Sequence, residues 1–146
     1  MKKSTKTPFM PAADYGRSLT GFNVNLLVRE VAPVVRFLRE VAGIEPVYDD
    51  LDLAILRHDG VDWMIHAEHT YDDRPMLART RAANLRGAGC ELRLYNIDPD
   101  AAEARARAHG YEVLAPSEDK PHGLRECYLV DPEGYVWVPG RPLPPD

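Results

Sequence analysis

The sequence predicts an α+β domain built from two βαβββ units. The first observation behind this prediction is that a strand, a helix and three further strands occur in that order twice. The second copy starts roughly 70 residues after the first, which indicates an internal duplication. The other observation is the closing hairpin, in which "ECYLV" and "YVWV" flank the turn sequence "DPEG". The alternative is an ordinary α+β domain whose elements recur in this order by chance.

The elements of the first unit follow from hydrophobic periodicity. A strand is predicted at "FNVNLLV", from Phe22 to Val28. A helix follows within "EVAPVVRFLREVAG", where Pro33 suits the first turn and Gly43 the stop. Its apolar residues recur at helical spacing: Val34, Phe37, Leu38 and Val41. Three strands are then predicted at "EPVYD", "LAILRHD" and "VDWMIHAE".

The second unit repeats this order after a polar, Arg-rich stretch that we interpret as a linker with a short helical turn. A strand is predicted at "CELRLYNI", and a helix at "DPDAAEARARAHG", with Asp98 as its N-cap and Gly110 as its end. Strands are predicted at "YEVLAP", "LRECYLV" and "YVWVP", and "RPLPPD" is expected to end the sheet. The predicted organisation is an N-terminal arm (1–19) and one domain (20–142), divided into a first unit (20–70), a linker (71–88) and a second unit (89–142).

Charge and composition exclude several classes of protein. The hydrophobic content of 45% and the charged content of 28% are ordinary for a globular protein. A formal net charge of −5 argues against a general binder of nucleic acid or of anionic membranes. No run approaches the ~20 apolar residues of a membrane span, and the first residues lack the apolar segment of a signal peptide. Cys90 and Cys127 fall in predicted strands without CxxC spacing, so we expect reduced thiols and a cytoplasmic protein.

The predicted order of elements, the opening "NVNLLVRE" and the closing "GLRECYLVDPEGYVWV" together resemble the vicinal oxygen chelate superfamily. This group includes glyoxalase I, extradiol dioxygenases, fosfomycin-resistance enzymes and bleomycin-resistance proteins. The ending "G-x-R-E-x-x-x-x-D-P-x-G" is most similar to the bleomycin-resistance and glyoxalase-like branches. The resemblance covers residues 20–142. It implies that the two units form curled, mixed sheets around a ligand-binding cup, and that the protein is a homodimer.

The resemblance also indicates where a metal ion would bind. Metal enzymes of the superfamily carry ligands on the first and last strands of each unit, and these positions match Asn23, His66, Glu91 and Val138. Only His66 and Glu91 are usual metal ligands, because an amide oxygen is a weak donor and valine has none. The resemblance therefore implies an incomplete metal site. A register shift of two residues would bring Asn25 and Glu68 to these positions, and His69 and His122 are further candidates in loops.

Strand alternation predicts which side chains face the cup. The predicted ligand-binding set is polar with a few apolar members: Asn23, Asn25, Met64, His66, Glu68, Glu91, Arg93, Tyr95 and Val138. The opposite faces are more apolar and are expected to pack under the helices. Glu91 and Arg93 allow a second interpretation, in which they form a solvated structural ion pair on an open sheet.

These features favour a glyoxalase/bleomycin-resistance-like protein that binds a small molecule in the cup without a complete catalytic metal site. Such a protein would sequester a drug or metabolite, as in antibiotic resistance, and would need no cofactor. The alternative is a metal-dependent lyase, isomerase or dioxygenase, in which His66 and Glu91 bind a divalent metal. The valine at position 138 favours the first hypothesis. Neither hypothesis includes a nucleic-acid or membrane partner.

Overall fold

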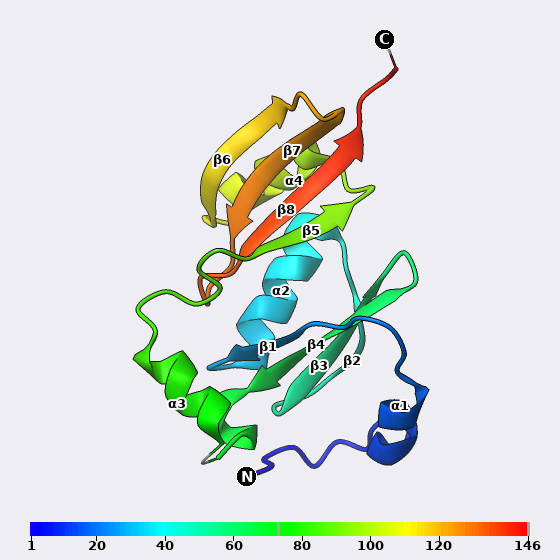
Figure 1. Ribbon diagram of the computed structural model, residues 1–146, viewed down its shortest axis with the longest axis vertical. Helices are drawn as coiled ribbons and strands as arrows, with labels where there is room; N and C mark the ends of the chain where they lie inside the picture. The colour runs from blue at the N-terminus through cyan, green and yellow to red at the C-terminus, as the bar shows by residue number, and fades with distance from the viewer. Residues whose placement is uncertain (73, 146) are drawn as a thin grey trace. The chain divides into compact units, whose positions relative to one another are not determined.

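The computed structural model describes residues 1–72 and 74–145, and the chain divides into two compact units. Unit 1 consists of Met1–Val35 and Ile44–Ala82, and unit 2 of Arg36–Gly43 and Ala83–Asp146. Each unit contains one four-stranded mixed sheet, so the predicted α+β fold with two curled βαβββ sheets is confirmed (Figure 1). No helix among the described residues is both long and apolar enough to cross a membrane.

The sheet of unit 1 has the strand order β1-β4-β3-β2. β1 runs parallel to β4, and the other neighbours are antiparallel. The strands are β1 (Asn25–Val28), β2 (Pro46–Asp49), β3 (Leu53–His58) and β4 (Val61–Ala67). Parallel strands need a crossover connection, and the crossover here begins with α2 (Val31–Ala42). The periodic residues of α2 are buried as predicted: Val34, Phe37, Leu38 and Val41 are at most 1% exposed.

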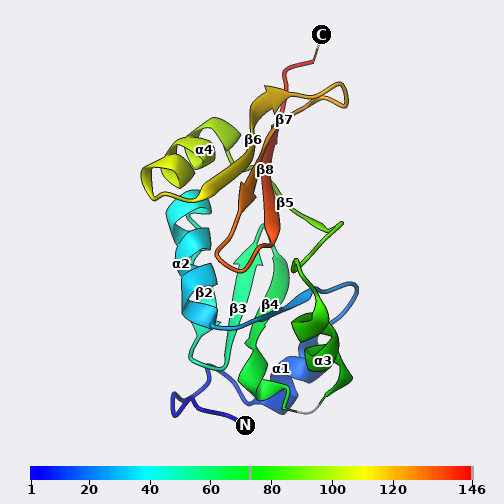
Figure 2. The ribbon, with the colours of Figure 1, turned by 90° about the vertical axis from the view of Figure 1, so that its left-hand side faces the viewer.

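Unit 2 repeats this arrangement with the strand order β5-β8-β7-β6. Its elements are β5 (Glu91–Tyr95), α4 (Pro99–Ala108), β6 (Glu112–Asp119), β7 (Leu124–Val130) and β8 (Val136–Pro142). α4 lies against one face of this sheet (Figure 2). Asp98 caps α4 as predicted, by accepting a hydrogen bond from the backbone of Asp100 at 3.1 Å. Cys127 is buried beneath this helix, and burial raises the pKa of its thiol to about 12.

Several predicted boundaries are wrong. The first strand begins at Asn25 instead of Phe22, and the Asn23 side chain before it donates to the backbone oxygen of Asp62 at 2.7 Å. Cys90 precedes β5 and is exposed, whereas we expected it within the strand. β8 continues to Pro142, because proline is tolerated at a strand end and the next residue, Leu143, donates to the oxygen of Gly123 at 2.9 Å.

The stretch predicted as a linker with one helical turn contains α3 (Pro75–Ala82), a regular helix of eight residues. Leu77 is its buried residue and fixes it to unit 1. The fourth strand of unit 1 ends at Ala67, one residue earlier than predicted, and is followed by the 3-10 turn η1 (Glu68–Thr70). The N-terminal arm contains α1 (Ala12–Ser18), which has no buried residue.

Gly87 permits a close approach that a larger residue would obstruct. It has φ +67°, and a Cβ atom there would lie 2.5 Å from Tyr135 Cδ1. Gly43 also has φ +67° but has open space at the Cβ position. Gly87→Ala should therefore lower the free energy of unfolding by about 1 kcal/mol more than Gly43→Ala, because only the first substitution adds overpacking to the backbone strain. Urea unfolding of both variants measures the difference, and equal losses would contradict it.

Candidate functional site

The N-terminal arm is attached to unit 1 through Asp52, which lies in the turn between β2 and β3. This carboxylate is 2% exposed and accepts hydrogen bonds from the backbone of Lys3 at 2.8 Å and of Ser4 at 3.1 Å. His69 Nε2 lies 2.7 Å from the same carboxylate. Buried carboxylates need such partners. Asp52 therefore serves as the main anchor of the arm.

The ionisation of Asp52 should control this attachment. Burial alone would raise the pKa of Asp52, but the hydrogen bonds from His69, Lys3 and Ser4 outweigh it and lower the pKa. A carboxylate with a lowered folded-state pKa stabilises the fold when ionised, and this stabilisation is lost as the pH falls through that pKa. We therefore expect the arm to stay attached near neutral pH and to detach only when the pH falls below the ordinary range of aspartate, through the lowered pKa of Asp52.

NMR measures this detachment through the amide chemical shifts of Lys3 and Ser4 during an acid titration. In Asp52→Asn these shifts should no longer follow a carboxylate titration. An unchanged titration curve in the variant would show that another group controls the arm.

Aromatic side chains of the arm and of β2 pack against one another. The Phe9 ring lies 5.8 Å from the ring of Tyr15 and 6.0 Å from that of Tyr48. Lys6 Nζ lies 4.9 Å from the Tyr48 ring centroid, a cation–π distance. Tyr48 OH donates to Asp50 at 2.6 Å, and burial together with this carboxylate raises the pKa of Tyr48 to about 12. Tyr48 is therefore a neutral hydrogen-bond donor that the arm covers.

The arm and the sheet of unit 1 enclose a cavity of about 350 Å³, which we call the arm cavity. Its lining is mostly apolar and comes from two segments. The arm contributes Lys2, Ser4, Lys6, Pro8, Phe9, Met10, Ala12, Tyr15, Gly16 and Leu19. The sheet and its β2–β3 turn contribute Tyr48, Asp50, Asp52, Leu53, Ile55, Met64 and His66.

Strand register explains how the sheet side of the arm cavity is built. Met64 and His66 are two residues apart on β4, so they share one face, as predicted. Leu53 lies opposite His66, and Ile55 lies opposite Met64, on the neighbouring strand β3. Side chains on the other face, such as Ile65, are fully buried. On the sheet side of the arm cavity, the apolar side chains of Leu53, Ile55 and Met64 therefore lie beside the imidazole of His66.

His66 is held by a chain of hydrogen bonds within unit 1. Its Nδ1 lies 2.7 Å from Asn25 Oδ1, and Asn25 Nδ2 donates to Tyr71 OH. The rings of His66 and Tyr71 lie 6.0 Å apart in an edge-to-face arrangement. Burial, together with the nearby charge of Arg74, lowers the pKa of His66. The structure therefore brings together two predicted residues, Asn25 and His66, and leaves His66 as a neutral imidazole near pH 7.

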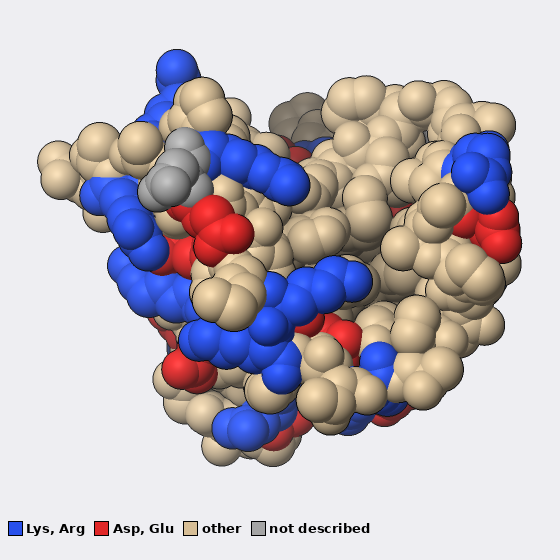
Figure 3. Space-filling model, turned by 90° about the horizontal axis from the view of Figure 1, so that it is seen from below, with Lys and Arg blue, Asp and Glu red and all other residues tan. Residues whose placement is uncertain are grey.

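The other two predicted residues of unit 1 lie away from the arm cavity. Asn23 lines a second cavity, and Glu68 lies in η1, where it forms an ion pair with Arg81 at 3.3 Å. In Figure 3, which shows the end that carries α1 and α3, Lys and Arg gather on the α3 side with Asp and Glu between them. That face is therefore not uniformly basic.

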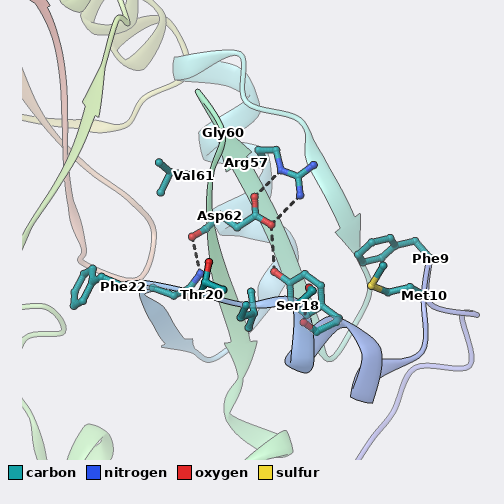
Figure 4. Close-up of a pocket in the computed structure, with 12 residues that line it drawn as sticks. Phe9, Met10, Ser18, Thr20, Phe22, Arg57, Gly60, Val61 and Asp62 are labelled. Atoms are coloured by element: carbon teal, nitrogen blue, oxygen red, sulfur yellow. Dashed lines mark hydrogen bonds and ion pairs between the residues drawn. The ribbon is translucent and has the colours of Figure 1, made fainter.

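The second cavity, which we call the outer cavity, has a volume of about 560 Å³ and lies beside the β3–β4 hairpin (Figure 4). Arg57 donates to both carboxylate oxygens of Asp62, at 2.6 and 3.0 Å. Tyr15 OH donates to the same carboxylate at 3.4 Å. Phe22, at the rim, is 87% exposed. The polar groups of this cavity pair with one another, so we take the arm cavity as the candidate site.

In unit 2 the predicted residues form an ion-pair network on one sheet face. Arg93 donates to Glu91 at 2.7 Å, to Tyr95 OH at 3.2 Å and to the buried carboxylate of Glu126. His122 Nε2 lies 2.7 Å from the same oxygen of Glu126. Burial opposes ionisation of Glu126, but His122 and Arg93 outweigh it and lower its pKa. The charges of Arg93 and Glu91 are thus compensated within the sheet.

The residues that matched the metal-ligand positions do not fit a tightly held metal ion. Val138 has no donor atom and is 1% exposed, and the Asn23 amide is bonded to the backbone of Asp62. Glu91 forms an ion pair with Arg93, and His66 bonds to Asn25. Within residues 1–72 and 74–145, no three His, Cys, Asp or Glu side chains are grouped to hold a metal ion.

Sequence reasoning missed the arm as a wall of the site, together with its anchor Asp52 and the hydroxyl of Tyr71. His69 was a candidate ligand from a loop, and the structure places it against Asp52 instead. The acidic turn "DDLD" was the available signal, because a carboxylate that follows a strand and lies next to apolar residues has to find partners.

Several solved structures have a fold similar to that of this chain. A glyoxalase/bleomycin resistance protein/dioxygenase family enzyme from Burkholderia phytofirmans PsJN has a TM-score of 0.68 and 16% identity over 83% of this chain and 97% of that chain. A glyoxalase-related enzyme from Fulvimarina pelagi has a TM-score of 0.64 and 19% identity, over 84% and 88%. A glyoxalase/bleomycin resistance protein/dioxygenase from Nocardioides has a TM-score of 0.62 and 18% identity, over 92% and 93%.

These similarities establish the fold of the vicinal oxygen chelate superfamily and confirm the predicted resemblance at the level of fold. At these identities they leave the activity open. Comparison with protein-family models and with curated proteins found no match.

Proposed function

We propose that this chain binds a small molecule in the arm cavity and sequesters it without a catalytic metal ion. The observation that carries the proposal is an apolar cavity of about 350 Å³ with one imidazole among its sheet residues. Small-molecule sites have this composition: apolar walls with a few polar groups that orient the ligand. The volume lies at the lower end of the usual range of about 300–1,000 Å³, so the ligand is small.

The side chains at the positions that match metal ligands favour small-molecule binding over metal catalysis. A catalytic divalent metal needs about three protein ligands and an open position. The matched positions supply two usual ligands, and each already has a hydrogen-bond partner in its own unit. The sequestered compound is accordingly a drug or metabolite that is held unchanged.

Fluorescence titration with 2-methoxynaphthalene, a small apolar probe, tests this proposal. We expect saturable binding at one site per chain, and loss of binding in Met64→Trp, because the larger side chain fills the arm cavity. Val47→Trp is the matched control, since Val47 is a strand residue 37% exposed that does not line the cavity. Circular dichroism establishes that both variants fold.

Two results would overturn the proposal. One is the absence of saturable binding, or binding that Met64→Trp leaves intact. The other is near-stoichiometric Zn²⁺, Ni²⁺, Mn²⁺ or Fe²⁺ in elemental analysis that disappears in His66→Phe. That outcome would instead favour a metal-dependent lyase, isomerase or dioxygenase, to be screened with glyoxalase and dioxygenase substrates.

A further inference from the structure

The polar groups on the sheet side of the arm cavity differ in what they offer a ligand. Asp50 Oδ1 accepts hydrogen bonds from the backbone of Asp52 and of Leu53, both at 2.8 Å, and Oδ2 accepts from Tyr48 OH. Asp52 is bonded to the arm and to His69. Both carboxylates therefore stabilise the protein itself. His66 is the remaining polar side chain on this side.

The orientation of the Asn25 amide indicates which nitrogen of His66 carries the proton. Asn25 Nδ2 donates to Tyr71 OH, so the amide presents its oxygen to His66 Nδ1. An oxygen acceptor 2.7 Å away requires a proton on Nδ1. In the neutral imidazole the other nitrogen, Nε2, then has a lone pair and no proton. Asn25 does not line the arm cavity, whereas His66 does, so Nε2 is the nitrogen left for a ligand.

We infer that the ligand is an apolar, planar molecule that carries one hydrogen-bond donor, such as a phenolic hydroxyl or a ring N–H, and donates it to His66 Nε2. This inference rests on the proposed function and adds the chemical class of the ligand. The walls supply apolar contact through Leu53, Ile55 and Met64, and the aromatic rings of Tyr15 and Phe9 suit a flat molecule. Asn25 acts as a positioning residue, because it sets the protonation of His66 without lining the cavity.

A matched pair of probes tests the inference: 2-naphthol, which has a hydroxyl donor, and 2-methoxynaphthalene, in which a methyl group replaces that proton. We expect 2-naphthol to bind about tenfold more tightly, the value of one net hydrogen bond. In His66→Phe, which keeps a ring of similar size, both probes should bind and the preference should disappear. Asn25→Leu should reduce the preference, because no acceptor then holds the proton on Nδ1.

The outcomes separate the two proposals. If both probes bind wild-type protein equally, the inference on ligand class is wrong while the proposed binding function stands. If neither binds, the proposed function itself fails. A third probe, 2-naphthoate, examines the exposed Lys2 and Lys6 at the arm side of the cavity. Tightest binding of naphthoate would assign an anionic ligand instead and overturn the inference.

NMR of protein labelled with ¹⁵N-histidine gives a readout independent of binding. The chemical shifts of the two ring nitrogens of His66 should identify Nδ1 as protonated and Nε2 as unprotonated near neutral pH. Asn25→Leu should shift this distribution, whereas Asp49→Ala, at a half-buried residue that pairs with Lys6, should leave it unaltered. A protonated Nε2 in the wild-type protein would contradict the inference.

Discussion

Asp52→Ala should lower the free energy of unfolding by about 3 kcal/mol and release the N-terminal arm. The carboxylate accepts two backbone hydrogen bonds from the arm and one contact from His69, at a position that is 2% exposed. Removing this acceptor loses three contacts to a charged, buried carboxylate, and a hydrogen bond to a charged group contributes about 1 kcal/mol or more. Asp52→Asn keeps the shape and one acceptor oxygen, so it should lose about half as much.

Urea unfolding measures the change in stability, and hydrogen exchange at the amides of Lys3 and Ser4 measures release of the arm. Asp49→Ala is the control. Asp49 is a half-buried residue whose carboxylate lies 3.6 Å from Lys6, and such a solvent-accessible pair should change stability by no more than about 0.5 kcal/mol. Unaltered exchange at Lys3 and Ser4 in Asp52→Ala would show that other contacts hold the arm.

Release of the arm should also affect the candidate site. The arm contributes more than half of the residues that line the arm cavity, including the rings of Phe9 and Tyr15. Asp52→Ala should therefore weaken binding of 2-methoxynaphthalene even though Asp52 itself offers the probe no apolar contact. The contacts of the arm that remain include the Phe9–Tyr48 ring contact, the Lys6–Tyr48 cation–π contact and the hydrogen bond from Tyr15 to Asp62.

The sequence alone predicted those parts of the fold that depend on local patterns. Helical spacing identified α2, and the cap at Asp98 identified the start of α4. Alternation along β4 placed Met64 and His66 on one face, and both line the arm cavity. Trp63 and Trp137 lie on the strand faces that were expected to pack under the helices, and they are 8% and 2% exposed. Period and capping are properties of neighbouring residues, which a sequence displays directly.

The rest of the site depends on contacts between distant residues. Lys3 and Asp52 are 49 positions apart, and no periodicity connects them. Asn25 was found by alternation, but its link to Tyr71 bridges 46 positions. In unit 2, Arg93 reaches Glu126 across 33 positions. These pairs form only when folding brings distant segments together, so the sequence could indicate candidates in single segments but not their partners.

The other large effect concerns Asp131, the first residue of the "DPEG" turn between β7 and β8. Its Oδ1 accepts from the backbone of Glu133 at 2.8 Å and of Tyr135 at 3.1 Å, and its Oδ2 accepts from Trp137 Nε1 at 2.9 Å. Glu133 also forms an ion pair with Arg86 at 3.3 Å, and both side chains are less than 8% exposed. The residues of this turn therefore form a network of hydrogen bonds and one ion pair, and the ion pair joins the turn to the segment before β5.

Asp131→Ala should lower the free energy of unfolding by about 3 kcal/mol, because three donors lose one buried acceptor. Burial raises the pKa of Asp131, so its charge is costly to the fold and part of the loss is offset when the charge is removed. Asp131→Asn should lose less, since its oxygen can still serve the backbone amides, but its NH₂ group cannot accept from Trp137.

Urea unfolding measures both losses, and the near-ultraviolet circular dichroism of Trp137 reports the lost indole contact. Asp119→Ala is the matched control, because Asp119 is an exposed carboxylate at the end of β6 that pairs with Arg125. A loss in Asp131→Ala no greater than that in Asp119→Ala would mean that the Arg86–Glu133 pair and the antiparallel ladder hold the turn without Asp131. Equal losses in Asp131→Ala and Asp131→Asn would instead assign the whole effect to the bond with Trp137.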